Sequence, residues 1–181
     1  MLFDSHTHIN SEMYSDEERA QVIAAIENSD VKTVVYIGCD LATSQMATEH
    51  AKKYPWCYAA VGFHPHETRH MDEMTLMMIK SLAKKEKVVA IGEIGLDFHY
   101  DHSPRDVQEY WFREQIKLAN ELRLPIVIHS READNRTLEI LKEEGAFSNE
   151  RKGYFPQKPD GSSDARVLLH CYSGSPELAE Q

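Results

Sequence analysis

Cysteine is scarce in this chain, and its three cysteines, Cys39, Cys57 and Cys171, lie far apart. Their odd number and wide spacing exclude a disulfide framework and a Cys-x-x-Cys metal knuckle. Long apolar runs are also missing, since none approaches the roughly 20 residues of a membrane span. No basic segment followed by an apolar one marks a secretory signal. We therefore expect a cytoplasmic protein with free thiols and no membrane partner.

Basic residues are outnumbered, with 20 Lys and Arg against 30 Asp and Glu and a formal net charge of −10. This balance argues against a protein that coats DNA regardless of sequence, because such proteins bind by neutralising phosphates with Lys and Arg. An anionic substrate stays compatible, because bound divalent ions can reverse the local field of a site. The 181 residues are enough for one globular domain with its own core.

Short apolar runs alternate with amphipathic helical patterns along the whole chain. We predict strands over residues 2–4, 33–37, 58–61, 88–91, 126–129 and 167–170, and helices over residues 16–28, 43–53, 72–85, 104–121 and 133–144. This order predicts an α/β fold, a parallel sheet covered by helices. Residues 148–164 are polar and contain Gly and Pro, so they are expected to form a long surface loop. Met71, Met74, Met77 and Met78 are expected to face the core.

Two histidines stand where the first predicted strand ends. His6 and His8 are two residues apart, so on a strand their imidazoles point to the same side. Neutral imidazole is a common ligand of divalent metal ions. The pair is therefore half of a metal site, or else two polar residues near a terminus.

Further ionisable residues follow other predicted strands. Glu93, His129 and His170 lie at or near the ends of the fourth, fifth and sixth strands. In parallel α/β folds the carboxyl ends of the strands meet at one rim, where sites form. Because imidazole and carboxylate groups are costly to bury unless they are paired or bound to metal, the set favours a metal site.

The ligand types narrow the choice of ion. Imidazoles with a carboxylate and no thiolate suit Zn²⁺, Mn²⁺, Co²⁺ or Fe²⁺, and Mg²⁺ less well. A carboxylate such as Glu93 can bridge two ions about 3.5–4 Å apart, a spacing that activates water and clamps the oxygens of a phosphoryl displacement.

Other polar residues near the strand ends have open alternatives. His64 and His66 flank Pro65 on a loop, and we favour His64 as the substrate contact and His66 as an exposed loop residue. Arg131 follows His129 closely and either binds a phosphate with its forked guanidinium or pairs with a surface acid. Asp97 either accepts a hydrogen bond from a ligand histidine or caps its own loop.

Five segments together resemble a known family. They read FDSHTHIN, VGFHPHE, AIGEIGLDFHYD, LPIVIHSREA and LLHCYSGS, occur in this order and span positions 3 to 175. The chain thereby resembles the TatD-type metal-dependent deoxyribonucleases, a branch of the amidohydrolase-like TIM barrels. His-x-His alone is a weak signal, whereas the GEIGLD, HSREA and HCYSG segments together are specific.

The resemblance implies a barrel of eight βα units and a Mg²⁺- or Mn²⁺-requiring nuclease, in some members a 3′→5′ exonuclease. The family's metal ligands correspond to His6, His8, Glu93, His129 and His170. We accordingly expect a deoxyribonuclease that holds one or two divalent ions (Mg²⁺, Mn²⁺ or Zn²⁺) and hydrolyses DNA ends or single strands with a metal-activated water. Glu93 and His64 are its expected catalytic residues, and His64 and Arg131 are expected to steady the phosphate.

The chain also departs from the family pattern. It carries about six of the eight βα units, and the family aspartate expected after a seventh strand has no counterpart. We expect residues 1–181 to form a single hydrolase domain that stops after the sixth strand. Three accounts are open: a fragment, a sheet completed by a second copy in a homo-oligomer, or a remnant that binds metal without catalysis. Hydrolysis of another ester or an amide is the alternative activity.

Overall fold

The computed structural model of the chain describes residues 1–172 and 174. Its strands form one six-stranded sheet in the order β1-β2-β3-β4-β5-β6, and all neighbouring strands are parallel. The strands are β1 (Leu2–Thr7), β2 (Val31–Ile37), β3 (Cys57–Val61), β4 (Val88–Asp97), β5 (Ile126–Arg131) and β6 (Val167–Leu169). The helices are α1 (Asp16–Glu27), α2 (Leu41–Lys53), the 3-10 helix η1 (Pro65–His70), α3 (Glu73–Ala83), α4 (Arg105–Leu122), α5 (Asp134–Glu143) and α6 (Asn149–Lys152).

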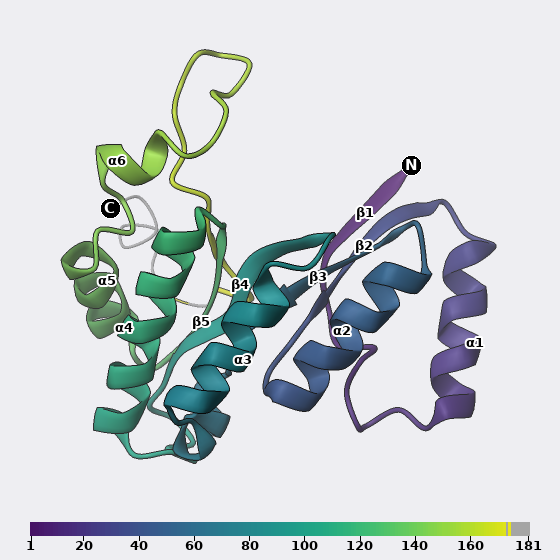
Figure 1. The fold of residues 1–181 in the computed structure, drawn as a ribbon, viewed down its shortest axis with the longest axis horizontal. Coiled ribbons are helices and arrows are strands. Elements are labelled where there is room, and N and C mark those ends of the chain that lie inside the picture. Colours follow the sequence, from purple (N-terminus) through teal and green to yellow (C-terminus); the bar gives the residue numbers. More distant parts are fainter. Residues whose placement is uncertain (173, 175–181) are drawn as a thin grey trace.

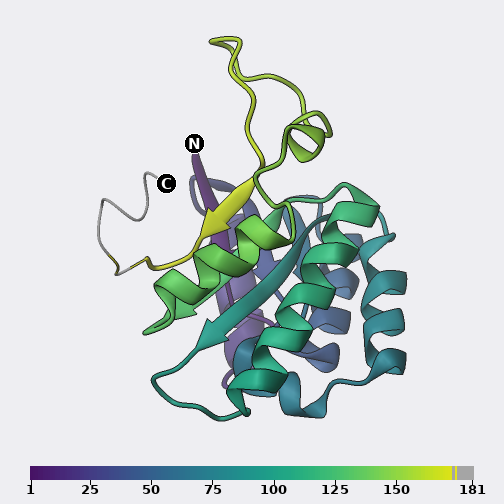
Figure 2. The ribbon, with the colours of Figure 1, turned by 90° about the vertical axis from the view of Figure 1, so that its left-hand side faces the viewer.

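The sheet curls so that the helices lie on its outer face (Figure 1). Figure 2 shows α3 and α4 together on one side of the sheet, and the segment between α6 and β6 projecting beyond the rest of the described chain. This arrangement confirms the predicted α/β fold with a parallel sheet and sequential strand order. No helix among the described residues has both the length and the apolar character needed to cross a membrane.

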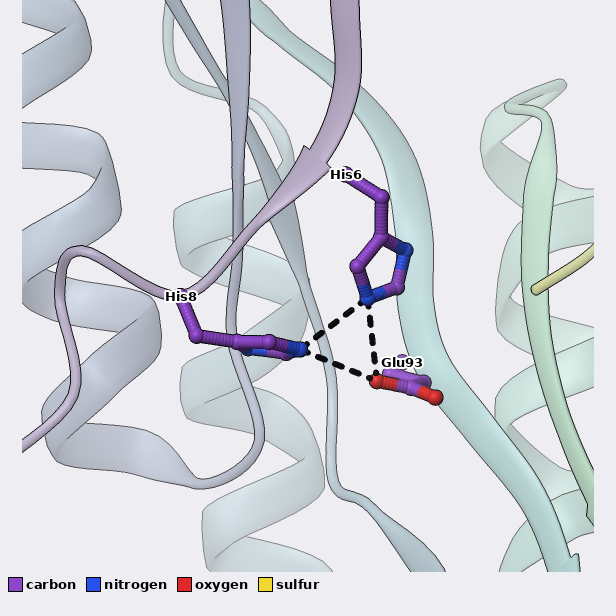
Figure 3. A group of neighbouring side chains, drawn as sticks. All are labelled: His6, His8 and Glu93. Atoms are coloured by element: carbon purple, nitrogen blue, oxygen red, sulfur yellow. Dashed lines mark hydrogen bonds and ion pairs between the residues drawn. The ribbon is translucent and has the colours of Figure 1, made fainter. Parts of the chain in front are cut away.

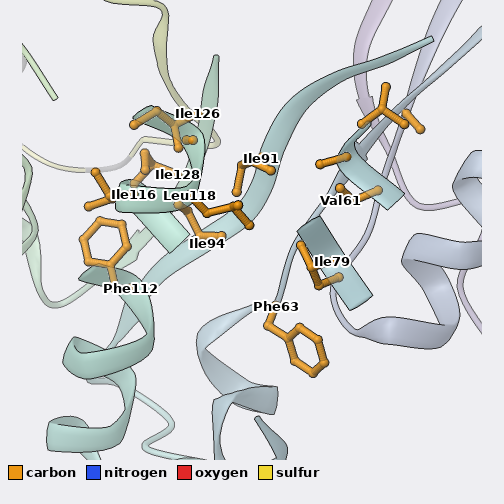
Figure 4. Packing of buried hydrophobic residues seen from close by; sticks show 14 of the residues in the cluster. Val61, Phe63, Ile79, Ile91, Ile94, Phe112, Ile116, Leu118, Ile126 and Ile128 are labelled. Atoms are coloured by element: carbon orange, nitrogen blue, oxygen red, sulfur yellow. The ribbon is translucent and has the colours of Figure 1, made fainter. Parts of the chain in front are cut away.

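Strand residues alternate between two cores, as the period of a β-strand requires. In β2, Val34 and Tyr36 belong to the large cluster under the helices, whereas Val35 and Ile37 belong to a small cluster on the other face. Figure 4 shows part of the large cluster, in which isoleucines of β4 and β5 pack against Phe112 of α4. Burial of the outer face therefore fixes which side of each strand points to the inner, concave face.

Strand β4 is longer than the sequence predicts. Residues 88–91 are predicted as a strand, but β4 continues to Asp97 and pairs with β5 as far as Arg131. Gly95 makes this possible, because it has φ +142° and a Cβ at this position would collide with the carbonyl oxygen of His129. Gly95, a residue type that is also common in turns, thus lets β4 and β5 lie very close together.

The predicted loop over residues 148–164 is wrong in part, because it contains helix α6. Arg151 of α6 is buried and donates hydrogen bonds to Ala165 O (3.0 Å), Asn120 Oδ1 (2.6 Å) and Leu124 O (2.8 Å). This side chain therefore ties the segment before β6 to the end of α4.

The predicted burial of the methionines is also mostly wrong. Met71 is buried, but Met74, Met77 and Met78 are exposed on α3. Residues Ile79, Leu82 and Ala83 supply the buried face of this helix instead.

Candidate metal centre

The carboxyl ends of the parallel strands bring the predicted site residues to one rim. His6 lies in β1, His8 directly follows it, Glu93 lies in β4, and His129 lies in β5. An open pocket of about 790 Å³ lies at this rim, and His8, Glu93 and His129 are among the residues that line it. Its volume is in the range of sites for small ligands or for part of a larger one.

His6, His8 and Glu93 form a first group of converging donor atoms (Figure 3). The two Nε2 atoms of His6 and His8 are 3.0 Å apart, and they lie 3.4 and 3.6 Å from Glu93 Oε2. Glu93 is only 2% exposed. A buried carboxylate oxygen therefore meets two imidazole nitrogens that point at each other.

His64, Glu93 and His129 form a second group of converging donors. Glu93 contributes its other oxygen here, because Oε1 lies 3.2 Å from His129 Nδ1. The rings of His64 and His129 meet edge to face with their centroids 4.3 Å apart. One carboxylate thus faces both groups, one oxygen to each.

Asp97, at the end of β4, orients the second group through a hydrogen bond to His129. Its Oδ2 accepts hydrogen bonds from His129 Nε2 (3.0 Å) and His66 Nε2 (2.9 Å). Its Oδ1 accepts hydrogen bonds from the backbone N–H groups of His99 (3.1 Å) and Tyr100 (2.9 Å). Both alternatives that the sequence leaves open for Asp97, a bond to a histidine and a loop cap, are present at once.

The carboxylates of the centre stay ionised. Burial alone would raise the pKa of Glu93, but hydrogen bonds from His129 and His6 outweigh burial and hold that pKa well below its ordinary value. Burial likewise opposes the charge on Asp97, but the Tyr100 backbone N–H and the two histidines lower its pKa to about 2. The centre therefore carries two negative charges at neutral pH.

Most of the imidazoles at the site whose pKa values are shifted have lowered values, which favour the neutral form that binds metal. Burial lowers the pKa of His64 to about 3, and it also lowers the pKa values of His8 and His170. His129 differs: burial opposes its protonation, but Glu93 and Asp97 together raise its pKa.

The donor set fits a divalent ion. Two imidazole nitrogens 3.0 Å apart can share only one proton, yet both also face the same carboxylate oxygen. A cation between them would satisfy all three atoms together. Imidazole and carboxylate ligands without thiolate suit Zn²⁺ and Mn²⁺ well and Mg²⁺ less well.

His170 and His64 are arranged differently from the sequence-based expectation. The ring of His170 lies parallel to that of His6 with centroids 3.3 Å apart, and within the described part of the chain it joins neither group of converging donors. His64, expected to contact substrate, instead belongs to the second group.

Two further residues at this rim, His66 and Cys39, make contacts with the site that the sequence does not predict. His66 was expected to be an exposed loop residue, but it lines the pocket and donates to Asp97. Cys39 lies directly beyond β2, with Sγ 3.6 Å from His8 Nδ1, and burial raises the pKa of its thiol. The one sequence feature that indicates a role for these two residues is their location, because each follows a strand that ends at the rim.

Arg131 reaches the same pocket but none of the described carboxylates forms an ion pair with it. Its guanidinium carbon instead lies 4.7 Å from the centroid of the Tyr100 ring. The alternative of pairing with a surface acid is therefore not what the structure shows.

Comparison with known families finds one match over nearly the whole chain. The sequence model of the family described as TatD related DNase matches residues 3–181. A Bacillus subtilis protein named as the uncharacterized metal-dependent hydrolase YabD is 43% identical over 181 residues, which is 100% of this chain and 64% of that protein. A 3′-5′ ssDNA/RNA exonuclease TatD from Pantoea sp. is 37% identical over 180 residues, 99% of this chain and 63% of the relative.

Solved structures agree on the fold. The Escherichia coli TatD homologue YJJV superposes with a TM-score of 0.79 at 27% identity, over 98% of this chain and 62% of that one. A TatD family hydrolase from Entamoeba histolytica gives a TM-score of 0.78 at 23% identity, a likeness of fold alone. The TIM-barrel-like architecture predicted from the sequence is thereby confirmed. The chain spans less than two thirds of the length of each of these relatives.

Proposed function

Because this chain belongs to the TatD related DNase family, we propose that residues 1–181 form one metal-dependent hydrolase domain that cleaves phosphodiester bonds of single-stranded DNA. The observation that carries this proposal is the position of Glu93, whose Oε2 faces His6 and His8 and whose Oε1 faces His129. The names of relatives support the substrate class, since several are called 3′-5′ ssDNA/RNA exonucleases.

The residues that would hold the ions fall into the two groups around Glu93. His6, His8 and Glu93 would hold one divalent ion, and His129 with His64 and Glu93 would hold another. Ions of this class supply Lewis-acid polarisation of the phosphate and a lowered pKa for a bound water. We propose Mg²⁺, Mn²⁺ or Zn²⁺ as the resident ion, with His170, whose ring stacks on that of His6, as a further ligand of the first group.

The other side chains would orient these groups and the substrate. Asp97 accepts from His129 Nε2, so it fixes the proton on that nitrogen and leaves Nδ1 to face the centre. Arg131 offers a forked guanidinium at the pocket for a phosphate oxygen pair. Hydrolysis breaks one P–O bond by addition of water, and we propose that the 3′-oxygen is the leaving group.

The first test is hydrolysis of end-labelled single-stranded DNA by the purified 181-residue chain with Mg²⁺ or Mn²⁺. We expect degradation that a chelator stops and that Glu93→Ala abolishes. Glu86→Ala is a matched control, because Glu86 is an exposed residue before β4 and should leave activity unchanged. If metal-bound protein degraded no single-stranded substrate, or if Glu93→Ala were as active as the parent, the proposal would be wrong.

The sheet edges support a proposal about assembly. Within the described part of the chain, strands β1 and β6 each have a neighbouring strand on one side only, and both expose apolar side chains, among them Phe3 and Leu169. Open edges with apolar residues tend to pair with another chain. We propose that a second copy covers them, and light scattering after gel filtration tests this: a dimer that Phe3→Lys dissociates supports it, and a monomer at all concentrations contradicts it.

The free thiols support a cytoplasmic location. Cys39, Cys57 and Cys171 form no disulfide with one another in the structure. Reduced thiols persist in the cytoplasm and are uncommon in secreted proteins. Fractionation of the cells that express the protein would check this location.

A further inference from the structure

An aromatic and cationic surface lies beside the metal centre, on the loop between β4 and α4 and at the end of β5. Tyr100, His102 and Arg131 form it, and we call these three residues the Tyr100 platform. Tyr100 and His102 have nearly parallel rings, 6° apart in orientation with centroids 5.5 Å apart. The guanidinium of Arg131 lies 4.7 Å from the Tyr100 centroid.

Arg131 connects this surface to the site. It lies two residues after His129 on β5, so both side chains leave the strand on the same face. Among the described residues that line the pocket, Arg131 is the single Lys or Arg. A guanidinium that stacks on an aromatic ring keeps its N–H edge free for a phosphate.

Tyr100 has surface available for a ligand. It is 49% exposed although Arg131, His66, His99 and His102 all contact its ring. Arg131 and His66, which contact this ring, also line the pocket, so the exposed part of Tyr100 is within reach of a ligand that occupies the pocket.

The position of Tyr100 is fixed by the metal centre itself. Asp97 Oδ1 accepts the backbone N–H of Tyr100, and Asp97 Oδ2 accepts Nε2 of His129. The backbone of Phe98 also donates to Arg131 O (2.9 Å). The Asp97 carboxylate and the pairing of β4 with β5 therefore fix the position of the platform relative to the second donor group.

We propose that the Tyr100 platform is a nucleobase subsite, where an unpaired base of a single-stranded nucleic acid stacks on Tyr100 and His102 while Arg131 binds the adjoining phosphate. This inference rests on the proposed function and adds the residues that recognise the strand. Aromatic stacking with help from arginine is the general way in which proteins bind single strands without regard to sequence. Bases inside a duplex keep their faces stacked on each other, so the subsite selects single strands or frayed ends.

The charge distribution agrees with this choice of ligand. The chain carries a net charge of −10, and Arg131 is the one Lys or Arg among the described residues of the pocket. Long-range attraction for a duplex is therefore weak, and short-range stacking has to supply much of the affinity.

Equilibrium binding to a short fluorescein-labelled phosphorothioate oligothymidylate, which resists hydrolysis, tests the subsite by fluorescence anisotropy in Mg²⁺. We expect Tyr100→Ala to weaken binding about fivefold to 100-fold, while Tyr100→Phe, which keeps the ring, binds within about twofold of the parent. Tyr110→Ala is the matched control, because Tyr110 is 48% exposed on α4 and its hydroxyl donates to Glu73 of α3.

An oligonucleotide with abasic positions separates stacking from a structural effect. Tyr100→Ala should lose much less affinity for the abasic strand than for the base-bearing strand. Equal binding of the parent and Tyr100→Ala to the base-bearing strand, or an equal loss on both strands, would overturn the subsite. If the parent itself fails to bind any single strand, the proposed function fails as well, so the two failures are distinguishable.

Discussion

At the scale of single residues, Asp97 and Glu93 organise the site in different ways. Glu93 presents one oxygen to each donor group, so removing it should disturb both groups. Asp97 touches neither His6 nor His8 but joins His129, His66 and the Tyr100 loop. The sequence identified both carboxylates, because each lies in or at the end of an apolar strand. It could not show that Asp97 uses both oxygens, since that depends on how the β4–α4 loop folds back.

Asp97→Asn should reduce stability in a pH-dependent way. The pKa of Asp97 is about 2 in the folded protein against an ordinary 3.8, so its carboxylate stabilises the fold above pH 3.8. That contribution is lost as the pH falls through about 2. We expect the variant to be about 1–3 kcal/mol less stable at neutral pH, with the difference closing toward pH 2.

Urea unfolding of the metal-free parent and variant at a series of pH values measures this difference. Asp101→Asn serves as the control, because Asp101 is partly exposed and pairs with Arg105 on the surface. A difference between Asp97→Asn and parent that stayed constant down to pH 2 would contradict the assigned role of the carboxylate.

At the scale of elements, the strands and helices were largely predictable, and the exceptions have physical causes. Apolar runs located all six strands, but Gly92 and Gly95 obscured the second half of β4 because glycine is also a turn residue. Helix α6 was missed since four residues carry no amphipathic period, and its burial depends on one arginine. The methionines of α3 were placed in the core by residue type, although the helix buries a different face.

Gly95→Ala should be strongly destabilising because two costs add at this position. The positive φ costs about 1 kcal/mol for a residue with a Cβ, and overpacking against the His129 carbonyl adds about 1–3 kcal/mol. Gly161 has φ +83° with nothing within 4 Å of a Cβ, so Gly161→Ala should show only the first cost. Urea denaturation compares the two variants, and equal destabilisation would refute the close contact of β4 with β5.

Arg151→Ala should loosen the segment that precedes β6. The side chain donates to Ala165 O, Asn120 Oδ1 and Leu124 O, and its loss removes the donor from one buried and two part-buried acceptors. We expect a loss of about 2–4 kcal/mol and faster proteolysis within residues 153–164. The neighbouring Lys152→Ala should leave both unchanged, and limited proteolysis that did not separate the variants would argue against this anchor.

At the scale of the whole molecule, the order of the strands determines the site. A parallel sheet in sequential order places every strand end at one rim, so residues from 6 to 131 meet although they are far apart in sequence. The sequence therefore predicted which residues gather there. It did not predict that His64 would join Glu93 and His129 in the second group, because that depends on how η1 packs against β4 and α4.

The overall charge predicts a shallow dependence of nucleic-acid binding on salt. Each phosphate neutralised contributes a slope of about −0.7 to log K against log salt for single strands. Arg131 is the single Lys or Arg among the described pocket residues, so we expect Arg131→Gln to make the slope shallower by about 0.7. Anisotropy titrations over a range of KCl concentrations measure it, and a slope several times steeper would point to a basic surface elsewhere.

The central claim is that Glu93, His6 and His8 hold metal, and metal content tests it most directly. We would compare purified parent protein with the His6→Ala, Glu93→Ala double variant by elemental analysis after equilibration with Mn²⁺. A double variant with exposed residues, His70→Ala and Glu86→Ala, is the control. The account predicts bound metal in the parent and the control and little in the His6, Glu93 variant. Unaltered metal content in that folded variant would contradict it.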